Sequence, residues 1–352
     1  MPFVIGIIIA VTMLLAVEIR LRGLGIEPNV RDSPELWAAQ RELAAQLGNQ
    51  AIIVVGDSRG QLDIDLPTLK EATGLTPVQL AIDGSWSLPV LADLAADPRI
   101  TGTIIVDTSA GKLIPQSSRD RSHEWTEFYQ KKYRGLLSPA IETRLKGFLQ
   151  EKSALYSSMI PLDRLPGILF SNNKYSSTYL KTRSDRQRDG DYRLVKMPDF
   201  YVARVIRHFG GQQLLKNKYF RSFAEFDSSM REQIAGQPAR DPGADQKLKS
   251  EYEGKLSYVH SLVKQIQARN GRIFFVRFPS DKLVWLIDDY RQPRWVFWDT
   301  FAQTTSATAV HFQDFPDLRK YSLPDGSHLD QRDKKSFTTA LVAALSLKKA
   351  GS

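Results

Sequence analysis

The sequence predicts an α/β protein: a three-layer sandwich with a doubly wound parallel sheet between helices, plus an inserted, mainly helical cap and an N-terminal transmembrane helix. From residue 51 onward, short β-branched runs alternate with helical segments, and this alternation is typical of a parallel sheet with helices on both faces. Between residues 113 and 255 the alternation stops, which indicates an insertion. Residues 3–17 form an almost unbroken apolar run, which indicates the anchor.

Residues 1–22 are predicted to form the membrane anchor. The first 17 residues carry no charged side chain, and Glu18, Arg20 and Arg22 follow directly. The apolar run is near the lower limit of about 17 to 20 residues for crossing a bilayer. A cleaved signal peptide is less favoured, because no clear small-x-small site follows and the N-terminal part lacks lysine and arginine. A buried helix or strand is the remaining alternative.

Residues 23–50 are predicted to link the anchor to the body through one amphipathic helix. Ser33 is a typical N-cap residue, Pro34 suits the first helical position, and Gly48 follows the segment. The apolar side chains between them are Leu36, Trp37, Leu43 and Leu47. We therefore expect a capped helix between membrane and body.

The sheet core is expected in two separate stretches, residues 51–112 and 256–348. Residues 51–55 are a continuous apolar run with Gly56 and Asp57 after it, which is typical of a buried parallel strand ending in a sharp turn. The other predicted elements are helix 66–72, strand 78–82, helix 88–96, strand 103–106, helix 258–268, strand 272–277, strand 309–312 and helix 332–347. Ligands of such sheets bind beyond the carboxyl ends of the strands, where Ser58, Gly84 and Thr108 fall.

The insertion, residues 113–255, is predicted to be a basic, mainly helical cap. Its helical segments, 125–136, 140–149 and 200–209, are separated by polar stretches such as 182–191 and 236–245. It holds 26 lysine and arginine residues against 17 acidic ones, an excess of nine that equals the net charge of the whole chain. Such an excess favours an anionic partner, either an acidic polysaccharide or an anionic lipid surface, although a merely solvated basic surface is equally consistent. No nucleic-acid-binding signature accompanies it, so we expect no nucleic-acid partner.

Three residues have the chemistry of a Ser-His-Asp triad. Ser58 follows the first predicted strand, and Asp325 stands three residues before His328. A serine hydroxyl attacks an acyl carbon only if a base takes its proton, and the imidazole needs a third group to hold its other nitrogen. The alternative for Ser58 is a helix N-cap, and for residues 325–327 an ordinary turn before the last helix.

The blocks Gly56-Asp57-Ser58 and Asp325-Gly326-Ser327-His328, in this order, resemble those of the SGNH (GDSL-like) hydrolase superfamily. The resemblance implies a flavodoxin-like sandwich with Ser58 as nucleophile, His328 as general base and acid, and Asp325 orienting the imidazole. It also implies an oxyanion hole from the N–H groups of Ser58 and Gly84. The asparagine usual in the third block is missing, so Thr108 or Ser109 replaces it, or two donors suffice.

Three further residues are candidates for substrate binding. Arg59 directly follows Ser58, and Arg277 ends a predicted strand at the same edge of the sheet, so either is placed to bind an anionic group. A structural ion pair is the alternative for both. Trp86, just beyond Gly84, lines the acyl pocket in one interpretation and packs in the core in the other.

The chain has no cysteine, which excludes disulfides, a thiol nucleophile and a cysteine zinc site. The other histidines, His123, His208, His260 and His311, have no ligand-like spacing, and we expect them to be surface or core residues. Neither a metal nor a cofactor is expected.

The resemblance leads us to expect a membrane-anchored serine ester hydrolase or O-acyltransferase, with acetyl as the acyl group, acting on an envelope polysaccharide or acylated glycan. The nearest functional analogy is to anchored SGNH-like proteins that are paired with a membrane-bound O-acyltransferase. We expect a single-pass protein of the inner membrane with a periplasmic or extracellular body, although Arg20 and Arg22 alone would favour a cytoplasmic body. The alternative function is a catalytically silent binding or assembly protein for an envelope polysaccharide complex.

Overall fold

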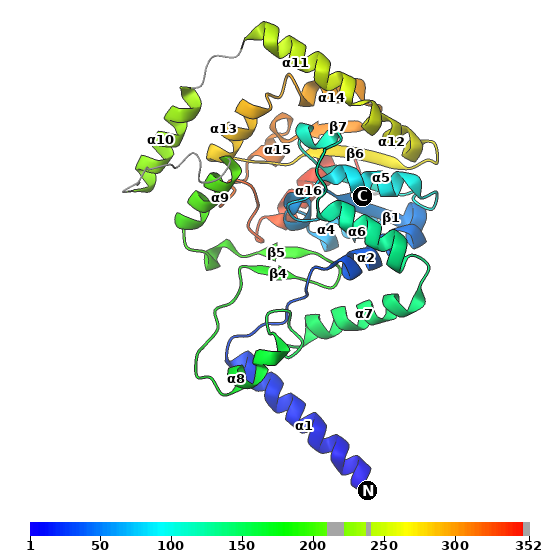
Figure 1. Ribbon diagram of the computed structural model, residues 1–352, viewed down its shortest axis with the longest axis vertical. Coiled ribbons are helices and arrows are strands. Elements are labelled where there is room, and N and C mark those ends of the chain that lie inside the picture. The colour runs from blue at the N-terminus through cyan, green and yellow to red at the C-terminus, as the bar shows by residue number, and fades with distance from the viewer. Residues whose placement is uncertain (210–221, 237–240, 348–352) are drawn as a thin grey trace.

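The centre of the molecule is a parallel sheet, seen in a computed structural model that describes residues 1–209, 222–236 and 241–347 (Figure 1). Its five strands are β1 (Ala51–Val55), β2 (Thr76–Gln79), β3 (Thr103–Asp107), β6 (Arg272–Arg277) and β7 (Thr308–His311). They lie in the order β2-β1-β3-β6-β7, and every neighbouring pair is parallel. The prediction of an α/β protein with a parallel sheet is confirmed.

Strand β1 shows why the sheet lies between two layers. All five of its residues are buried. Ile53 and Val55 belong to one apolar cluster, and Ile52 and Val54 belong to the cluster on the opposite face. A continuous apolar run is expected of a strand that is covered on both sides. Each fully buried side chain of this type contributes about 1.5–3 kcal/mol relative to an exposed one.

Helices pack on both faces of the sheet. One apolar cluster includes side chains of α2 (Pro34–Leu47), α5 (Ser87–Ala96), α6 (Arg121–Phe128), α11 (Pro242–Lys255), α12 (Ser257–Gln267) and α14 (Trp298–Thr304). The other cluster includes side chains of α4 (Leu66–Thr73), α15 (Pro316–Arg319) and α16 (Lys334–Ala344). The linker helix begins as predicted: the Ser33 side chain accepts the Leu36 N–H, and Pro34 is the first residue of α2.

The second strand ends earlier than predicted, at Gln79 instead of residue 82. The N–H groups of Leu80 and Ile82 still donate to the carbonyls of Val54 and Gly56. The N–H of Ala81 instead donates to the side chain of Gln79, so the regular pattern stops. The last helix is also shorter than predicted, beginning at Lys334 and ending at Ala344.

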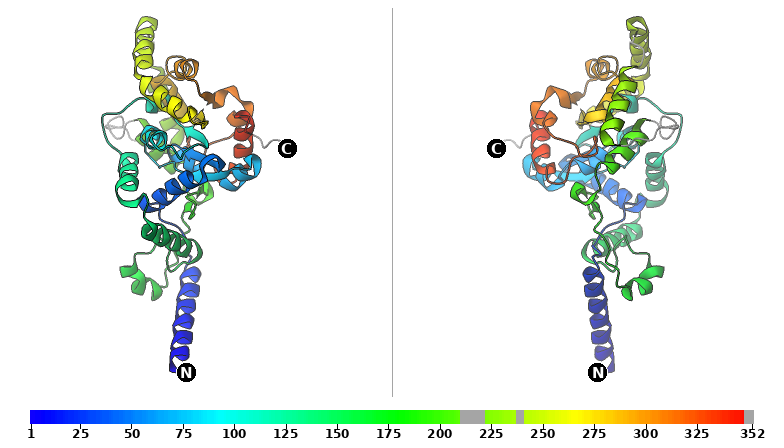
Figure 2. Two further views of the ribbon diagram at one scale, coloured as in Figure 1. Left: turned by 90° about the vertical axis from the view of Figure 1, so that its right-hand side faces the viewer. Right: turned by 90° about the vertical axis from the view of Figure 1, so that its left-hand side faces the viewer.

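The N-terminal helix α1 (Pro2–Gly23) extends away from the rest of the protein (Figures 1 and 2). At 1.5 Å per residue it is about 33 Å long, and the hydrocarbon core of a bilayer is about 30 Å thick. Among the described residues it is the one helix long and apolar enough to cross a membrane. Its last turn and the residues after it pack on α8 (Leu165–Leu169) through Leu21, Leu24, Ile26 and Ile168.

The long segment between β3 and β6 is mostly helical, but it does not pack as one unit. Besides α6, α8 and α11 it contains α7 (Leu137–Lys152), α9 (Asp199–Phe209) and α10 (Phe223–Ala235). Trp125 of α6 and Tyr252 of α11 belong to the core cluster of the sheet. Residue 113 therefore does not separate two cores, because these large side chains fill the space beside α5 and α12.

A short antiparallel hairpin lies in the stretch predicted to be only polar. It consists of β4 (Leu180–Thr182) and β5 (Arg188–Gly190). Arg186, in the turn, is fully buried and donates to the carboxylate of Asp32 and to the carbonyls of Gln79 and Ala81. This arginine attaches the hairpin to the end of β2, a contact that local sequence does not indicate.

The remaining helices are short or lie beside the candidate site. They are α3 (Ser58–Leu62), α13 (Lys282–Arg291), the π-helical turn Tyr129–Tyr133 after α6, and the 3₁₀ turns Gly48–Gln50, Ala110–Leu113, Leu162–Arg164, Tyr192–Leu194 and Phe312–Asp314. The predicted polar stretch 236–245 lies partly outside the described residues, and α11 begins within it.

Candidate active site

Ser58 is held at the start of a short helix by the turn that follows β1. Asp57 is the N-cap of α3, and its carboxylate accepts the N–H of Arg59 at 3.0 Å. Gly56 has φ of 153°, and a Cβ atom there would lie 2.6 Å from the Cβ of Asp107. Only glycine lets β1 pass so close to the end of β3. Ser58 therefore lies at the carboxyl edge between β1 and β3, where the order of the strands reverses.

His328 is held by a tight loop that its own sequence stabilises. The Oδ1 atom of Asp325 accepts the backbone N–H groups of Ser327 at 3.0 Å and His328 at 2.8 Å. Gly326 has φ of 77°, and a Cβ atom there would lie 2.8 Å from Val284 Cγ2. The loop thus depends on a glycine between the aspartate and the histidine.

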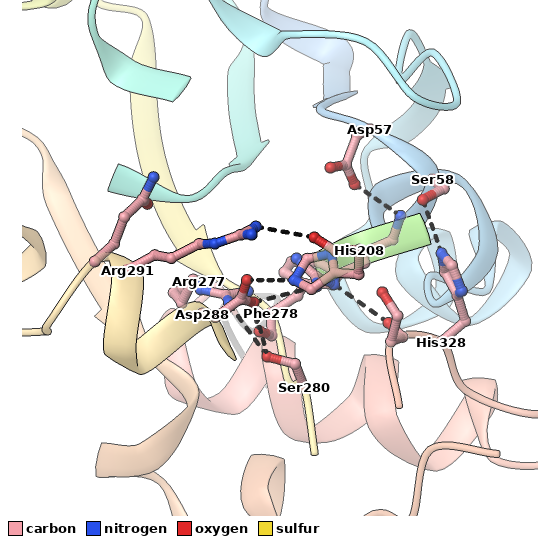
Figure 3. Close-up of polar contacts among 12 residues, drawn as sticks. Asp57, Ser58, His208, Arg277, Phe278, Ser280, Asp288, Arg291 and His328 are labelled. Carbon is pink, nitrogen blue, oxygen red and sulfur yellow. Dashed lines mark hydrogen bonds and ion pairs between the residues drawn. The ribbon is translucent and has the colours of Figure 1, made fainter. Parts of the chain in front are cut away.

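The three predicted triad residues lie in one chain of hydrogen bonds. His328 Nε2 lies 2.7 Å from Ser58 Oγ, and His328 Nδ1 lies 2.8 Å from Asp325 Oδ2. Figure 3 shows Ser58 and His328 pointing toward each other. His328 and Asp325 are both buried, at 2% exposure. In this geometry Nε2 can accept the serine proton while the carboxylate holds Nδ1–H.

Asp325 keeps its negative charge in this buried place. Burial alone would raise the pKa of Asp325, but the charge and hydrogen bond of His328, together with the charge of Arg204, hold that pKa below its usual value. Tyr192 also donates its hydroxyl to Asp325 Oδ2 at 3.1 Å. The carboxylate is therefore ionised at neutral pH and can stabilise a protonated imidazole.

Arg204 of α9 is a site residue that the sequence did not indicate. Its Nη2 atom lies 2.7 Å from His328 Nδ1 and 3.1 Å from Nε2, and its Nε atom lies 3.4 Å from Asp325 Oδ2. The side chain is about one quarter exposed, at 26%. No motif marks this arginine, because it reaches the site only through the way in which the insertion folds back over the sheet.

A pocket of about 250 Å³ opens over the serine, and the insertion supplies most of its lining. Its lining residues are Ser58, Leu62, Asp83, Tyr179, Leu180, Arg188, Tyr192, Phe200, Ala203, Arg204, Arg207, Asp325 and His328. The rings of Tyr179, Tyr192 and Phe200 form a cluster with centroids 5.1–6.0 Å apart. Arg188 pairs with Asp32 and Asp83, both at 3.3 Å. Arg207 is exposed and has no ion-pair partner among the described residues. The pocket thus combines an aromatic wall with a basic side.

Two of the predicted oxyanion donors remain candidates. Neither the N–H of Ser58 nor the N–H of Gly84 donates to an acceptor in the described part of the chain. Asp83, the neighbour of Gly84, lines the pocket. Gly84 itself is not among the residues that line the pocket.

Thr108, the third predicted donor, is not part of the site. Its N–H donates to the carbonyl of Val276, and its hydroxyl donates to the carbonyl of Ser109 at 3.1 Å. It is 2% exposed and does not line the pocket. The prediction was wrong because β3 continues its hydrogen bonding to β6 for one residue beyond Asp107.

The two predicted substrate-binding arginines are buried in a polar cluster beside the pocket. Arg59 Nε donates to the carbonyl of Ser327 at 3.2 Å, and its Nη2 lies 3.7 Å from Asp288. Arg277 donates to Asp288 at 2.5 Å and to the carbonyl of Phe278 at 3.0 Å. Figure 3 shows this cluster around Asp288, which His208 of α9 joins at 2.7 Å. Both arginines form structural ion pairs, so their predicted binding role is corrected.

Trp86 also lies away from the serine. Its backbone N–H donates to Asp120 at 2.7 Å, and its side chain lines a different groove, beside Leu88 of α5 and His123 of α6. The prediction that Trp86 lines the acyl pocket is therefore wrong. After the turn at Gly84 the chain continues into α5, so Trp86 lies on the face of the sheet that α5 covers.

Two carboxyl groups, of Asp57 and Asp107, lie beside each other beneath the serine turn. Asp107 is buried and accepts the N–H of Gly60 at 2.8 Å. Burial and the adjacent charge of Asp57 raise the pKa of Asp107 to about 8. Lys112 forms an ion pair with Asp57, and although burial opposes it, the charges of Lys112 and Arg59 hold the pKa of Asp57 well below its usual value. Asp57 is therefore ionised and Asp107 protonated at neutral pH, and the pair supports the turn without a net charge of −2.

The described residues contain no group of histidines and acidic side chains arranged to hold a metal ion. Comparisons with protein-family models and with curated proteins found no match to this chain.

Proposed function

We propose that this chain is a membrane-anchored serine ester hydrolase or O-acyltransferase of the SGNH (GDSL-like) type that acts on a cell-envelope glycan. One observation carries the proposal: the unbroken line of hydrogen bonds from Ser58 Oγ through His328 to Asp325. Ser58 and His328 are separated by 270 positions in the sequence, so their contact is a property of the fold and not of a local motif. The alternative interpretations, Ser58 as a helix N-cap and residues 325–327 as an ordinary turn, do not explain why Ser58 and His328 are in contact.

The first half of the reaction forms an acyl-enzyme. Ser58 Oγ attacks the carbonyl carbon of the ester while His328 Nε2 takes the hydroxyl proton. The C–O bond to the alcohol then breaks, and His328 returns the proton to the departing oxygen. Asp325 stabilises the imidazolium that exists between these two proton transfers.

The second half transfers the acyl group. Water or a sugar hydroxyl gives its proton to His328 Nε2 and attacks the acyl carbon, and Ser58 recovers its proton as it leaves. Water gives hydrolysis, and a sugar hydroxyl gives O-acyl transfer. We favour acetyl as the acyl group, because the pocket of about 250 Å³ is small and an acetyl group needs little room.

The N–H groups of Ser58 and Gly84 are the proposed oxyanion donors. The superfamily's third donor has no counterpart at Thr108, and losing one such donor costs about 3 kcal/mol. We infer that Arg204 offsets part of this loss, because its guanidinium lies within 3.1 Å of the nitrogen that faces Ser58. A fixed positive charge there stabilises an oxyanion that develops beside Ser58.

The pocket wall supports a carbohydrate substrate. Tyr179, Tyr192 and Phe200 present an aromatic cluster on which a sugar ring can pack, and Arg207 presents an exposed positive charge beside it. An acidic envelope polysaccharide satisfies both features. The apolar helix α1 supports a membrane-attached protein, and we propose a periplasmic or extracellular body that works with a membrane-bound O-acyltransferase.

The second candidate is a catalytically silent binding or assembly protein for an envelope polysaccharide complex. Thr108 favours this alternative, since both its N–H and its hydroxyl are committed to other groups. A protein of this kind would keep the aromatic and basic pocket and lose only turnover.

A serine-directed fluorophosphonate separates the two candidates. We expect the full chain to label at Ser58 and to turn over p-nitrophenyl acetate, and we expect Ser58→Ala and His328→Ala to do neither. Ser327→Ala is the matched control, because Ser327 lies beside His328 and its hydroxyl has no hydrogen bond among the described residues. If the folded wild type neither labels nor turns over acyl esters, the silent protein is the correct interpretation.

A further inference from the structure

Helix α7 lies on the side of the body from which α1 extends (Figure 1), and it carries three exposed apolar side chains. Ile141, Leu145 and Phe148 are 67%, 58% and 57% exposed. Their spacing of four and three residues places them on one face of the helix. Gly147, on another face, lies under Ser184 and Leu36, where α7 packs on α2. Helix α7 is therefore supported from one side and leaves a row of large apolar groups uncovered on the other.

Phe170, at the end of α8, is the most exposed aromatic residue of the described chain, at 88%. The guanidinium of Arg20 donates to the carbonyls on both sides of it, Leu169 at 3.2 Å and Ser171 at 2.6 Å. Arg20 lies in α1 only one turn beyond the apolar run that ends at Val17. These two hydrogen bonds hold Phe170 beside the end of the apolar run of α1.

The C-terminal end of α7 is attached to the same level. The carboxylate of Glu18 in α1 accepts the N–H groups of Ala154 and Leu155 at 2.8 and 3.0 Å. Arg22 donates to the carbonyl of Lys152, the last residue of α7, at 2.9 Å. These three hydrogen bonds hold the C-terminal end of α7 against the last turns of α1. The row of exposed apolar side chains on α7 therefore begins beside the anchor.

The charges around this surface are complementary to a lipid surface. Residues 131–174 contain eight lysine and arginine residues against three acidic residues. The basic residues that are exposed include Lys131, Lys132, Arg134, Arg144 and Lys146. A cluster of this size next to a membrane span attracts anionic lipid headgroups.

We propose that Ile141, Leu145, Phe148 and Phe170 form a membrane-contact surface, and that its occupant is the bilayer crossed by α1. Helix α7 lies in the headgroup and acyl boundary, and the basic residues around it bind anionic headgroups. The surface is continuous with the anchor, which distinguishes a bilayer from a soluble partner. The inference depends on α1 spanning a membrane and not on the chemistry of Ser58.

A second attachment changes how the body behaves. A single helix allows the body to rotate and tilt about its exit point. Contact through α7, which at 1.5 Å per residue is about 24 Å long, limits both movements. The pocket at Ser58 is then held in one orientation and at one height relative to the membrane surface.

The absence of native cysteine allows a direct test with the full chain. Single cysteines replace Leu145, Phe148 or Phe170, each is labelled with an environment-sensitive fluorophore, and the protein is reconstituted in vesicles of phosphatidylcholine and phosphatidylglycerol that carry nitroxide-labelled lipid. Trp295→Cys is the matched control, since Trp295 is a similarly exposed aromatic residue, at 48%, outside this surface. Ile8→Cys, inside the apolar run, reports whether α1 has inserted.

Because an interfacial helix buries its apolar face about 5–10 Å into the boundary region, we expect quenching by about half or more at positions 145, 148 and 170 and little at 295. Quenching at position 8 but at none of the three test positions would overturn the proposal. A blue-shifted signal at 145 and 148 that resists lipid quenching and grows with protein concentration would also overturn it, because a second copy of the chain would then cover this face.

Discussion

Replacing Asp325 by asparagine tests the proposed relay, because the change keeps the size of the side chain and removes its charge. Asp325 Oδ1 accepts two backbone N–H groups, of Ser327 and His328, while Oδ2 faces His328 Nδ1 at 2.8 Å. Asparagine offers one oxygen and one NH₂ group. Its oxygen must occupy the Oδ1 position to keep the two backbone bonds, so its NH₂ group faces Nδ1.

An NH₂ group facing Nδ1 favours the imidazole tautomer that carries the proton on Nε2. That nitrogen then cannot accept the proton of Ser58. The same change in a Ser-His-Asp protease lowers kcat about 10⁴-fold, which corresponds to about 5.4 kcal/mol at 1.36 kcal/mol for each tenfold change. We expect a comparable loss of acyl-ester turnover here, with the fold retained because the loop keeps its backbone bonds.

The rates of fluorophosphonate labelling and of p-nitrophenyl acetate turnover measure the effect, and urea unfolding checks the fold. Asp330→Asn is a matched control: Asp330 accepts the backbone N–H groups of Tyr192 and Arg332, both at 3.0 Å, and has no contact with His328. If Asp325 only shaped a turn, the substitution would keep both backbone hydrogen bonds of that turn and leave labelling unchanged. Labelling of Asp325→Asn at the wild-type rate would refute the relay.

Two further predictions concern the buried charges near the site. The raised pKa of Asp107, about 8, means that between pH 4 and 8 the folded state binds a proton that the unfolded state lacks, so this group makes stability fall as pH rises, by up to about 1.4 kcal/mol per pH unit. Asp107→Asn should flatten that dependence in urea unfolding at pH 5 and pH 8, and an unchanged slope would contradict the assignment of the proton. Arg277→Gln should destabilise the fold by about 1.5–3 kcal/mol, because Asp288, whose side chain is 22% exposed, loses its closest ion-pair partner but keeps His208. Near-normal stability with a raised KM would instead restore Arg277 as a substrate-binding residue.

The sequence was sufficient wherever neighbouring residues decide the structure. The β-branched run at 51–55 forms a buried strand, Ser33 and Pro34 begin α2, and the helix after the first strand starts at Ser58, although its N-cap is Asp57 and not Ser58. The Asp325 loop also belongs here, since the carboxylate binds N–H groups only two and three residues away. These interactions span a few residues, so the spacing in the sequence already contains them.

Side-chain direction was not predictable at the strand ends. Thr108, Arg59 and Arg277 follow or end strands at the predicted edge, yet the hydroxyl of Thr108 bonds to Ser109 and both arginines turn toward Asp288. Successive side chains of a strand point to opposite faces, so a shift of one residue in where a strand ends changes whether a side chain faces the pocket or the core. A linear pattern that places a residue at the right edge does not determine which way it faces.

Tertiary structure alone decided which parts of the insertion reach the serine. Arg204, Tyr179 and Tyr192 enter the pocket because α9 and the β4–β5 hairpin fold over the carboxyl edge of the sheet. The hairpin is held by the buried Arg186, whose partners lie more than 100 residues away in the sequence. The sequence by itself determined the positions of the five strands of the central sheet, the cap of α2 and the Asp325 loop, because these depend on residues that are near neighbours in the chain. The surroundings of Ser58 depend on long-range packing, which acts only once the chain has folded.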